Sequence, residues 1–119
     1  MRSPRVSVVM SVYNDERYVG AAVESILEQT FEDFEFIIVN DGSTDRTREI
    51  LSAYNDSRIK IFDQQNRGLT FSLNRGLSLA RGEYIARMDG DDLSMPERFA
   101  REVTFLDENP RVGLVGTFA

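Results

Sequence analysis

The sequence predicts one α/β domain, in which a mostly parallel β-sheet lies between layers of helices on both faces. Short apolar runs of β character alternate with amphipathic segments along the chain, and this order is typical of parallel strands joined by right-handed crossovers. The connections are short, and no fixed-period repeat or low-complexity linker interrupts them. With 119 residues, the chain is long enough for one hydrophobic core and too short for two.

The first half of the chain predicts two strands, each followed by a helix. A nearly continuous apolar run at residues 5–12 indicates a strand that is covered on both faces. Residues 17–29 predict a helix, because their apolar side chains recur at helical spacing and form one stripe. Residues 34–39 predict the second strand. The helix after it has three candidate N-caps, which are Ser43, Thr44 and Asp45.

The next part of the chain repeats this order. Residues 58–62 alternate between apolar and polar side chains and predict a short strand near a sheet edge. A third helix ends before Gly82, and its predicted buried stripe consists of Leu69, Leu73, Leu77 and Ala80. Residues 83–88 predict the fourth strand, which runs directly into an acidic turn.

The last helix has a well-marked start. Ser94 and Glu97 have the spacing of a capping box, and Pro96 is tolerated in a first helical turn. Three apolar residues are expected to form its buried side: Phe99, Val103 and Leu106. Residues 112–116 then predict a fifth strand.

Composition excludes several kinds of chemistry. The net charge of -6 and the isoelectric point of about 4.6 argue against a nucleic-acid partner. Cysteine and histidine are both absent, which excludes disulfides, Cys/His zinc sites and Ser-His-Asp triads. Any bound metal would therefore be a hard cation held by oxygen. No apolar run approaches the roughly 18 residues of a membrane helix, and no signal peptide is apparent, so a cytoplasmic location is expected.

Polar side chains gather where the predicted strands end. Tyr13, Asp41 and the cluster Asp89-Gly90-Asp91-Asp92 each follow a strand, whereas the opposite ends carry ordinary turn residues. The carboxyl ends of parallel strands share one rim of the sheet, and that rim is where such folds bind ligands. Each motif alone is explained as well by a solvated turn, a helix cap or rim packing. Their joint position on one rim favours a binding site.

These side chains suit a nucleoside diphosphate. Asp41 can accept a hydrogen bond from a base N–H, and Tyr13 can stack on the base. Asp89, Asp91 and Asp92 can share a divalent cation that bridges two phosphates, since Mg or Mn prefers one or two carboxylates together with phosphate oxygens and water. A cation of this kind would allow an acidic protein to bind an anionic ligand.

The motifs at residues 6–14, 37–45, 66–76 and 86–98 resemble the nucleotide-sugar-binding segment of the family 2 glycosyltransferases, which have the GT-A fold. The resemblance implies a Rossmann-like three-layer sandwich whose strand order begins 3-2-1-4. It also implies a transferase that uses a nucleotide-diphosphate sugar, often UDP-linked, with Mg or Mn, and that inverts the anomeric configuration. A saccharide or a lipid-linked molecule would be the acceptor.

By position in the family motifs, the resemblance assigns roles to individual residues. Asp41 would read the base, and Tyr13 would lie beside it. Asp89-Gly90-Asp91 would be the DxD motif, with Asp91 as the direct metal ligand and Asp89 nearer the ribose or the metal-bound waters. Asp92 would support the loop. The acceptor-binding half, which carries the general base, is expected to lie outside this truncated GT-A segment, so no catalytic residue is expected and residues 1–119 alone are expected to be inactive.

This reading leaves an unprotected sheet edge at the predicted strand 83–88, through which we expect association into homo-oligomers.

Two other functions remain as alternatives: an inactive nucleotide-binding module and a sugar-phosphate nucleotidyltransferase. The second would need a Gly-rich, basic loop after the first strand, and Tyr13-Asn14-Asp15-Glu16 is neither. A phospho-receiver domain would need a late lysine, but the only lysine is Lys60.

Overall fold

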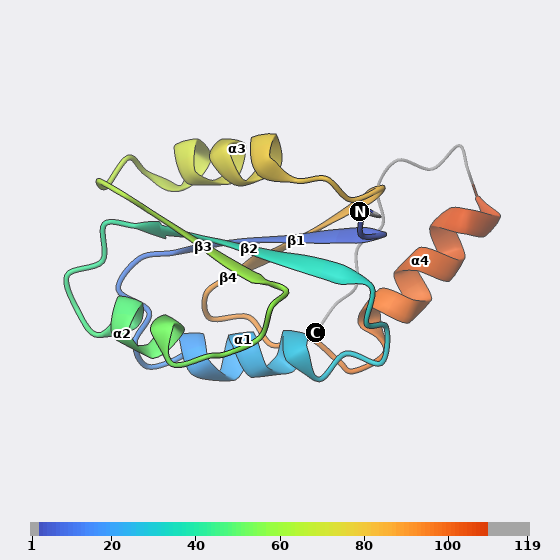
Figure 1. Cartoon of the computed structure of the whole chain (residues 1–119), viewed down its shortest axis with the longest axis horizontal. Coiled ribbons are helices and arrows are strands. Elements are labelled where there is room, and N and C mark those ends of the chain that lie inside the picture. Colours follow the sequence, from blue (N-terminus) through green and yellow to red (C-terminus); the bar gives the residue numbers. More distant parts are fainter. Residues whose placement is uncertain (1–2, 110–119) are drawn as a thin grey trace.

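The sheet of the protein consists of parallel strands in the order β3-β2-β1-β4 (Figure 1). This computed structural model describes residues 3–109. The strands are β1 (Val6–Val12), β2 (Phe34–Asp41), β3 (Ile59–Gln64) and β4 (Tyr84–Asp89). The expected strand order, 3-2-1-4, is therefore confirmed. The predicted strand at residues 112–116 lies outside the described residues.

Helices cover both faces of the sheet, as predicted. They are α1 (Val19–Leu27), α2 (Thr47–Ser52), α3 (Leu69–Leu79) and α4 (Arg98–Glu108). In Figure 1, α3 lies on one face, α1 and α2 lie on the other, and α4 lies beyond the end at which β1 and β2 begin. Within residues 3–109, no helix is both long and apolar enough to cross a membrane.

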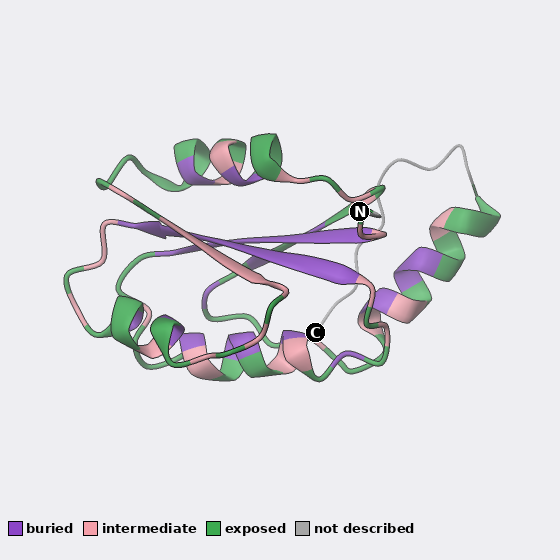
Figure 2. Cartoon of the chain, in the orientation of Figure 1, coloured by how far each residue is buried: buried purple, intermediate pink, exposed green. Residues whose placement is uncertain are grey.

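The core lies around the two central strands. Every residue of β1 and β2 is buried, as Figure 2 shows in purple. The stripe predicted for α1 packs against them, and its buried residues are Val19, Ala22, Val23 and Ile26. From α4, Phe99 meets Phe34 edge to face, with ring centroids 5.7 Å apart. The apolar run and the helical periodicity were thus reliable guides to the central layers.

The buried side of α3 differs from the predicted leucine stripe. Leu69 and Leu77 are 49% and 47% exposed, whereas Ser72 and Gly76 are buried. Gly76 allows this close packing, because a Cβ there would lie 2.4 Å from Cγ1 of Val9. The helix therefore approaches the sheet through its small residues, and its leucines lie to the side. The prediction was wrong because periodicity weighs large apolar residues and overlooks small ones.

The predicted capping box of α4 is also absent. Glu97 occupies the N-cap position without a side-chain cap bond. The Ser94 hydroxyl instead accepts a hydrogen bond from the Arg98 guanidinium at 3.0 Å. The backbone N–H of Phe99 donates to the side-chain oxygen of Gln29 at 3.0 Å, so a residue outside the helix provides the cap. Phe99 and Val103 are buried as predicted, whereas Leu106 is only half-buried.

β3 and β4 form the two edges of the sheet within residues 3–109, and β4 pairs there with β1 alone. The expected position of the third strand at an edge is confirmed. On β4, the side chain of Ile85 is 45% exposed. Association through this edge remains a prediction.

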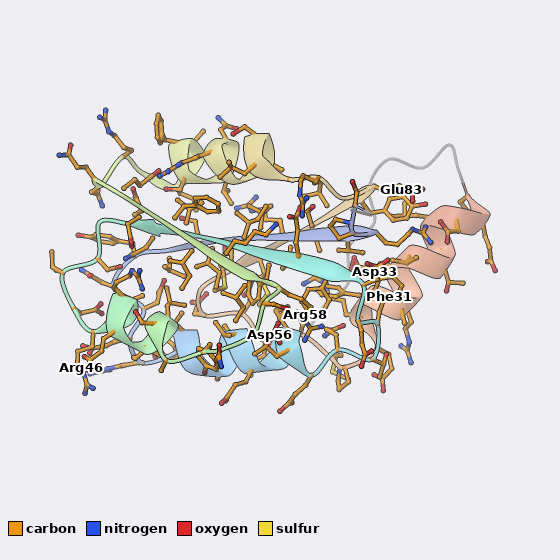
Figure 3. The ribbon with its side chains drawn as sticks, in the orientation of Figure 1. Phe31, Asp33, Arg46, Asp56, Arg58 and Glu83 are labelled. Carbon is orange, nitrogen blue, oxygen red and sulfur yellow. The ribbon has the colours of Figure 1, made fainter. Side chains whose placement is uncertain are left out.

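The rim at which the strands begin holds a buried ionic network around Glu35. Figure 3 labels Phe31, Asp33 and Glu83 near this end of the molecule and Arg46 at the other. The Glu35 carboxylate accepts hydrogen bonds from the Ser7 hydroxyl at 2.5 Å, the Arg81 backbone N–H at 2.7 Å and the Lys60 ammonium at 3.0 Å. Burial alone would raise the pKa of Glu35, but these hydrogen bonds outweigh it and lower the pKa to about 2. This rim therefore contains a buried, hydrogen-bonded carboxylate, although the sequence indicated only ordinary turn residues there.

Candidate functional site

A cleft of about 370 Å³ opens at the carboxyl ends of the strands. This volume lies within the range found for small-molecule binding sites. The residues predicted to bind nucleotide and metal line it together: Tyr13, Asp41, Asp89 and Asp91. The structure therefore brings these four residues to one place. The cleft is also lined by Ser11, Asp15, Asn66, Gly68, Leu69 and Gly90.

Tyr13 is held at the rim by a turn that is tied to the neighbouring loop. Asn14 has a φ of 51°, a left-handed conformation that asparagine tolerates. Its side-chain oxygen accepts a hydrogen bond from the Thr44 N–H at 2.8 Å, and its own N–H donates to the Ser43 hydroxyl at 3.1 Å. Because the loops after β1 and β2 are joined in this way, the half-exposed ring of Tyr13 has a defined position beside the cleft.

Asp41 is buried at the end of β2 and organises the loop before α3. Its carboxylate accepts hydrogen bonds from the backbone N–H groups of Arg67 and Gly68, at 2.7 Å and 3.0 Å, and from the Gln64 amide at 2.9 Å. Burial raises its pKa, but the bonds from Gln64, Arg67 and Gly68 outweigh this effect and lower the pKa overall. A carboxylate offers about four acceptor positions, so the ionised Asp41 retains capacity for a ligand N–H.

The acidic cluster closes a tight turn after β4. The N–H of Asp92 donates to the Asp89 carbonyl at 3.1 Å, and the N–H of Asp89 donates to the Asp92 carboxylate at 3.0 Å. Asp92 thus supports the loop, as expected. Carboxylate oxygens of Asp89, Asp91 and Asp92 lie within 4.8 Å of one another, and all three residues are exposed.

This arrangement fits an oxygen-bound divalent cation. Mg–oxygen bonds of about 2.1 Å place opposite ligands about 4.2 Å apart, which small side-chain rotations of the cluster can reach. The exposure leaves room for water or phosphate as further ligands. Arg87 supplies a partial countercharge, with its guanidinium 3.8 Å from the Asp89 carboxylate.

Asp15 is a fourth carboxylate of the cleft, to which the sequence assigned no role. Its Oδ2 accepts a hydrogen bond from the Tyr13 N–H at 3.1 Å, and a Cβ on Gly90 would lie 2.4 Å from the same oxygen. Burial raises the pKa of Asp15, and the charges of Asp91, Asp45 and Asp89 raise it further. The glycine between two aspartates was the one sequence signal of this close approach.

The chain matches the family model "Glycosyl transferase family 2" over residues 7–119. It is 45% identical over 118 residues to a putative glycosyltransferase, EpsE, of Bacillus subtilis, a match that covers 96% of this chain and 42% of the relative. An uncharacterized glycosyltransferase of Haemophilus influenzae is 42% identical over 118 residues, with 97% of this chain and 36% of the relative covered. The chain thus spans less than half the length of these relatives.

Solved structures agree with this match. TarS 1-349 of S. aureus in complex with UDP has a TM-score of 0.84 and 31% identity, over 89% of this chain and 33% of TarS. Its complex with UDP-GlcNAc gives the same TM-score, over 89% of this chain and 32% of TarS. The mannosyltransferase PcManGT of Pyrobaculum calidifontis, in complex with GDP-Man and Mn2+, has a TM-score of 0.77 and 27% identity, over 89% and 33% of the two chains. The chain therefore belongs to glycosyl transferase family 2 and has the GT-A fold, as the sequence motifs predicted.

Proposed function

We propose that this chain is the donor-binding part of an inverting glycosyltransferase, and that it binds a nucleotide-diphosphate sugar, preferably a UDP-sugar, together with Mg or Mn. The observation that carries the proposal is the convergence of Tyr13 and Asp41 with Asp89 and Asp91 in one cleft. Similar structures in complex with UDP and UDP-GlcNAc support the ligand class.

Asp41 and Tyr13 would bind the nucleoside. Asp41 is ionised and already accepts hydrogen bonds from Gln64, Arg67 and Gly68, so its carboxylate is fixed in position before a ligand arrives. Its remaining acceptor capacity suits the imide N–H of uracil. Tyr13 offers a half-exposed ring for stacking on the base. Guanine also carries an N–H donor, and the PcManGT complex with GDP-Man makes GDP the second candidate.

Asp91 and Asp89 would hold the cation at the diphosphate, with Asp91 as the direct ligand and Asp89 near the ribose or the metal-bound waters. When bound, the cation neutralises phosphate charge and stabilises the departing nucleoside diphosphate. Asp92 keeps the turn closed through its bond to the Asp89 N–H. The acidic cleft would then bind an anionic donor in spite of its own charge.

Inverting transfer would need a general base that removes the proton of the acceptor hydroxyl during attack on the sugar carbon. Two acidic residues of α4, Glu102 and Asp107, do not suit this task. Glu102 is buried and paired with Arg98 at 2.7 Å. Asp107 pairs with Arg5 at 2.7 Å and accepts a hydrogen bond from Tyr84 at 2.6 Å, and Tyr84 begins β4 at the end of the sheet away from the cleft. We therefore assign donor binding to the described residues, and we do not assign the general base to Glu102 or Asp107.

Calorimetric titration of UDP with and without MnCl2 tests the proposal. We expect binding that requires the metal and that Asp91→Ala abolishes, while Glu83→Gln, an exposed change at the opposite rim, leaves it intact. Titration with GDP under the same conditions measures the base preference. Absence of metal-dependent binding to either nucleotide, or equal binding by the Asp91→Ala variant, would refute the proposal.

A further inference from the structure

Gln29 is a buried polar residue that joins the end of α1 to the segment after the acidic turn. Only 4% of the residue is exposed. Its side-chain N–H group donates to the Met95 carbonyl at 2.6 Å and to the Ser25 carbonyl at 3.3 Å. Its side-chain oxygen accepts the hydrogen bond from the Phe99 N–H at 3.0 Å. One amide thus satisfies a loop carbonyl and an otherwise orphaned N–H in the first turn of α4.

Ser25 in α1 and Thr30, which follows the helix, hold the same segment. The Ser94 N–H donates to the Ser25 hydroxyl at 3.1 Å, and the Thr30 N–H donates to the Pro96 carbonyl at 2.9 Å. The path of the chain from residue 94 to residue 99 is therefore set by the carboxyl end of α1. Of Ser25, Gln29 and Thr30, only Gln29 forms hydrogen bonds with both the loop and α4.

The amino end of α1 meets the same loop near its apex. The Asp15 carbonyl accepts hydrogen bonds from Tyr18 and Val19 at the start of the helix, at 2.9 Å and 2.8 Å. The Asp15 carboxylate lies against Gly90, where a Cβ would come within 2.4 Å. The turn before α1 therefore contacts the acidic loop at Gly90, and Ser25 of α1 contacts the chain beyond the end of this loop, at Ser94.

We propose that Gln29 is a positioning residue for the metal-binding carboxylates. Asp89 is fixed by the pairing of β4 with Ser11 in β1, whereas Asp91 and Asp92 lie beyond the strand. Beyond the hydrogen bonds within the acidic turn, the chain is next held at Ser94 by Ser25, and at Met95 and Phe99 by Gln29. A short loop anchored at both ends has few conformations, so the second anchor sets where Asp91 lies relative to Asp89. This inference rests on the proposed cation-dependent binding of the donor.

The chemistry of the amide explains why glutamine suits this place. It supplies a donor for the Met95 carbonyl and an acceptor for the Phe99 N–H from one rigid plane. Leucine has a similar volume and would leave the Phe99 N–H without its partner, while the Met95 carbonyl would keep only the hydrogen bond from the Arg98 N–H at 3.0 Å. Glutamate would keep the acceptor and lose the donor. The two substitutions therefore separate capping of α4 from attachment of the loop.

The test compares wild type, Gln29→Leu and Gln29→Glu with Phe36→Leu. Phe36 is fully buried in β2, so its variant loses core stability without removing a hydrogen bond from the loop. Amide hydrogen exchange of residues 89–99 is measured first, because it needs no ligand. The affinity for UDP with MnCl2 is then measured by calorimetry.

We expect Gln29→Leu to accelerate exchange at residues 89–99 and to weaken binding of UDP with MnCl2 by about 10-fold to 100-fold, as changes to residues that support metal ligands do. Phe36→Leu should change affinity by less than about threefold. Gln29→Glu should keep the Phe99 amide protected and have an intermediate affinity. If Gln29→Leu matches Phe36→Leu in both measurements, the inference is overturned. If wild type does not bind the nucleotide, the proposed function fails, and loop exchange alone decides the positioning role.

Discussion

Replacing Glu35 by glutamine is expected to destabilise the fold near neutral pH, and to do so less as the pH falls. The folded state lowers the pKa of Glu35 from 4.5 to about 2, so folding favours the ionised form. The resulting stability is fully present above about pH 4.5 and is lost as the pH falls through about 2. At about 1.36 kcal/mol for each pKa unit, the difference corresponds to about 3 kcal/mol.

Water screens this interaction little, because the Glu35 side chain is only 4% exposed. Glutamine keeps a neutral acceptor for Ser7 or for the Arg81 N–H, so we expect a measured loss of about 2 kcal/mol near neutral pH. Lys60 would lose its ion pair but is 38% exposed and remains solvated. The loss should therefore reflect mainly the buried carboxylate and its hydrogen bonds.

Urea unfolding of wild type and Glu35→Gln at a series of pH values measures the difference in unfolding free energy. Using the difference cancels the titration of carboxylates that both proteins share. Glu83→Gln is the matched control, because Glu83 is 57% exposed and pairs with Arg5 at the surface, where an ion pair contributes less than about 1 kcal/mol. A gap between wild type and Glu35→Gln that is as large near pH 2 as near neutral pH would refute the reasoning.

Three further predictions follow from close contacts and exposed surfaces. Gly76→Ala should lower the unfolding free energy by about 1–3 kcal/mol, because its Cβ would lie 2.4 Å from the Val9 side chain; Gly20→Ala, with its nearest contact at 3.4 Å, should not lower it, and equal losses would contradict the packing argument. Asp15→Asn should raise the Tm in metal-free buffer by about 3 °C, since it removes one carboxylate from the acidic cleft, and an unchanged Tm in a calorimetric scan would count against this repulsion. Association through the β4 edge should appear in sedimentation velocity and be reduced by Ile85→Lys, whereas a wild-type monomer at high concentration would exclude it.

Sequence patterns predicted the features of the fold that depend on large apolar side chains. The continuous run of β1 and the stripe of α1 both describe faces that are buried along their whole length. The same reasoning was wrong for α3, because Ser72 and Gly76 are its closest contacts with the sheet. Small residues bring a helix close to its neighbour, but they contribute little to a periodic hydrophobic pattern.

The sequence predicted those residues of the candidate site whose motifs lie at the ends of strands. Parallel topology was enough to bring Tyr13, Asp41 and Asp91 into one cleft, because all strand ends of such a sheet share a rim. Asp15 was not assigned a role, since its proximity to Gly90 depends on how two loops pack. The cap of α4 was misassigned for a similar reason: local spacing suggested Ser94, and the partner that the fold provides is Gln29.

Two buried polar residues to which the sequence assigned no role both act on the surroundings of β4. Glu35 accepts a hydrogen bond from the Arg81 N–H just before β4 begins, and Gln29 binds the Met95 carbonyl after β4 has ended. Within residues 3–109, β4 pairs with only one neighbouring strand. Its backbone hydrogen bonds to other strands therefore constrain it less than those of the central strands do. A strand that carries the proposed metal ligands must nevertheless hold its register, because a shift of one residue would turn Asp89 to the opposite face of the sheet. Anchors at both ends of β4 meet this requirement, and they give the buried carboxylate of Glu35 and the buried amide of Gln29 a role in holding this strand.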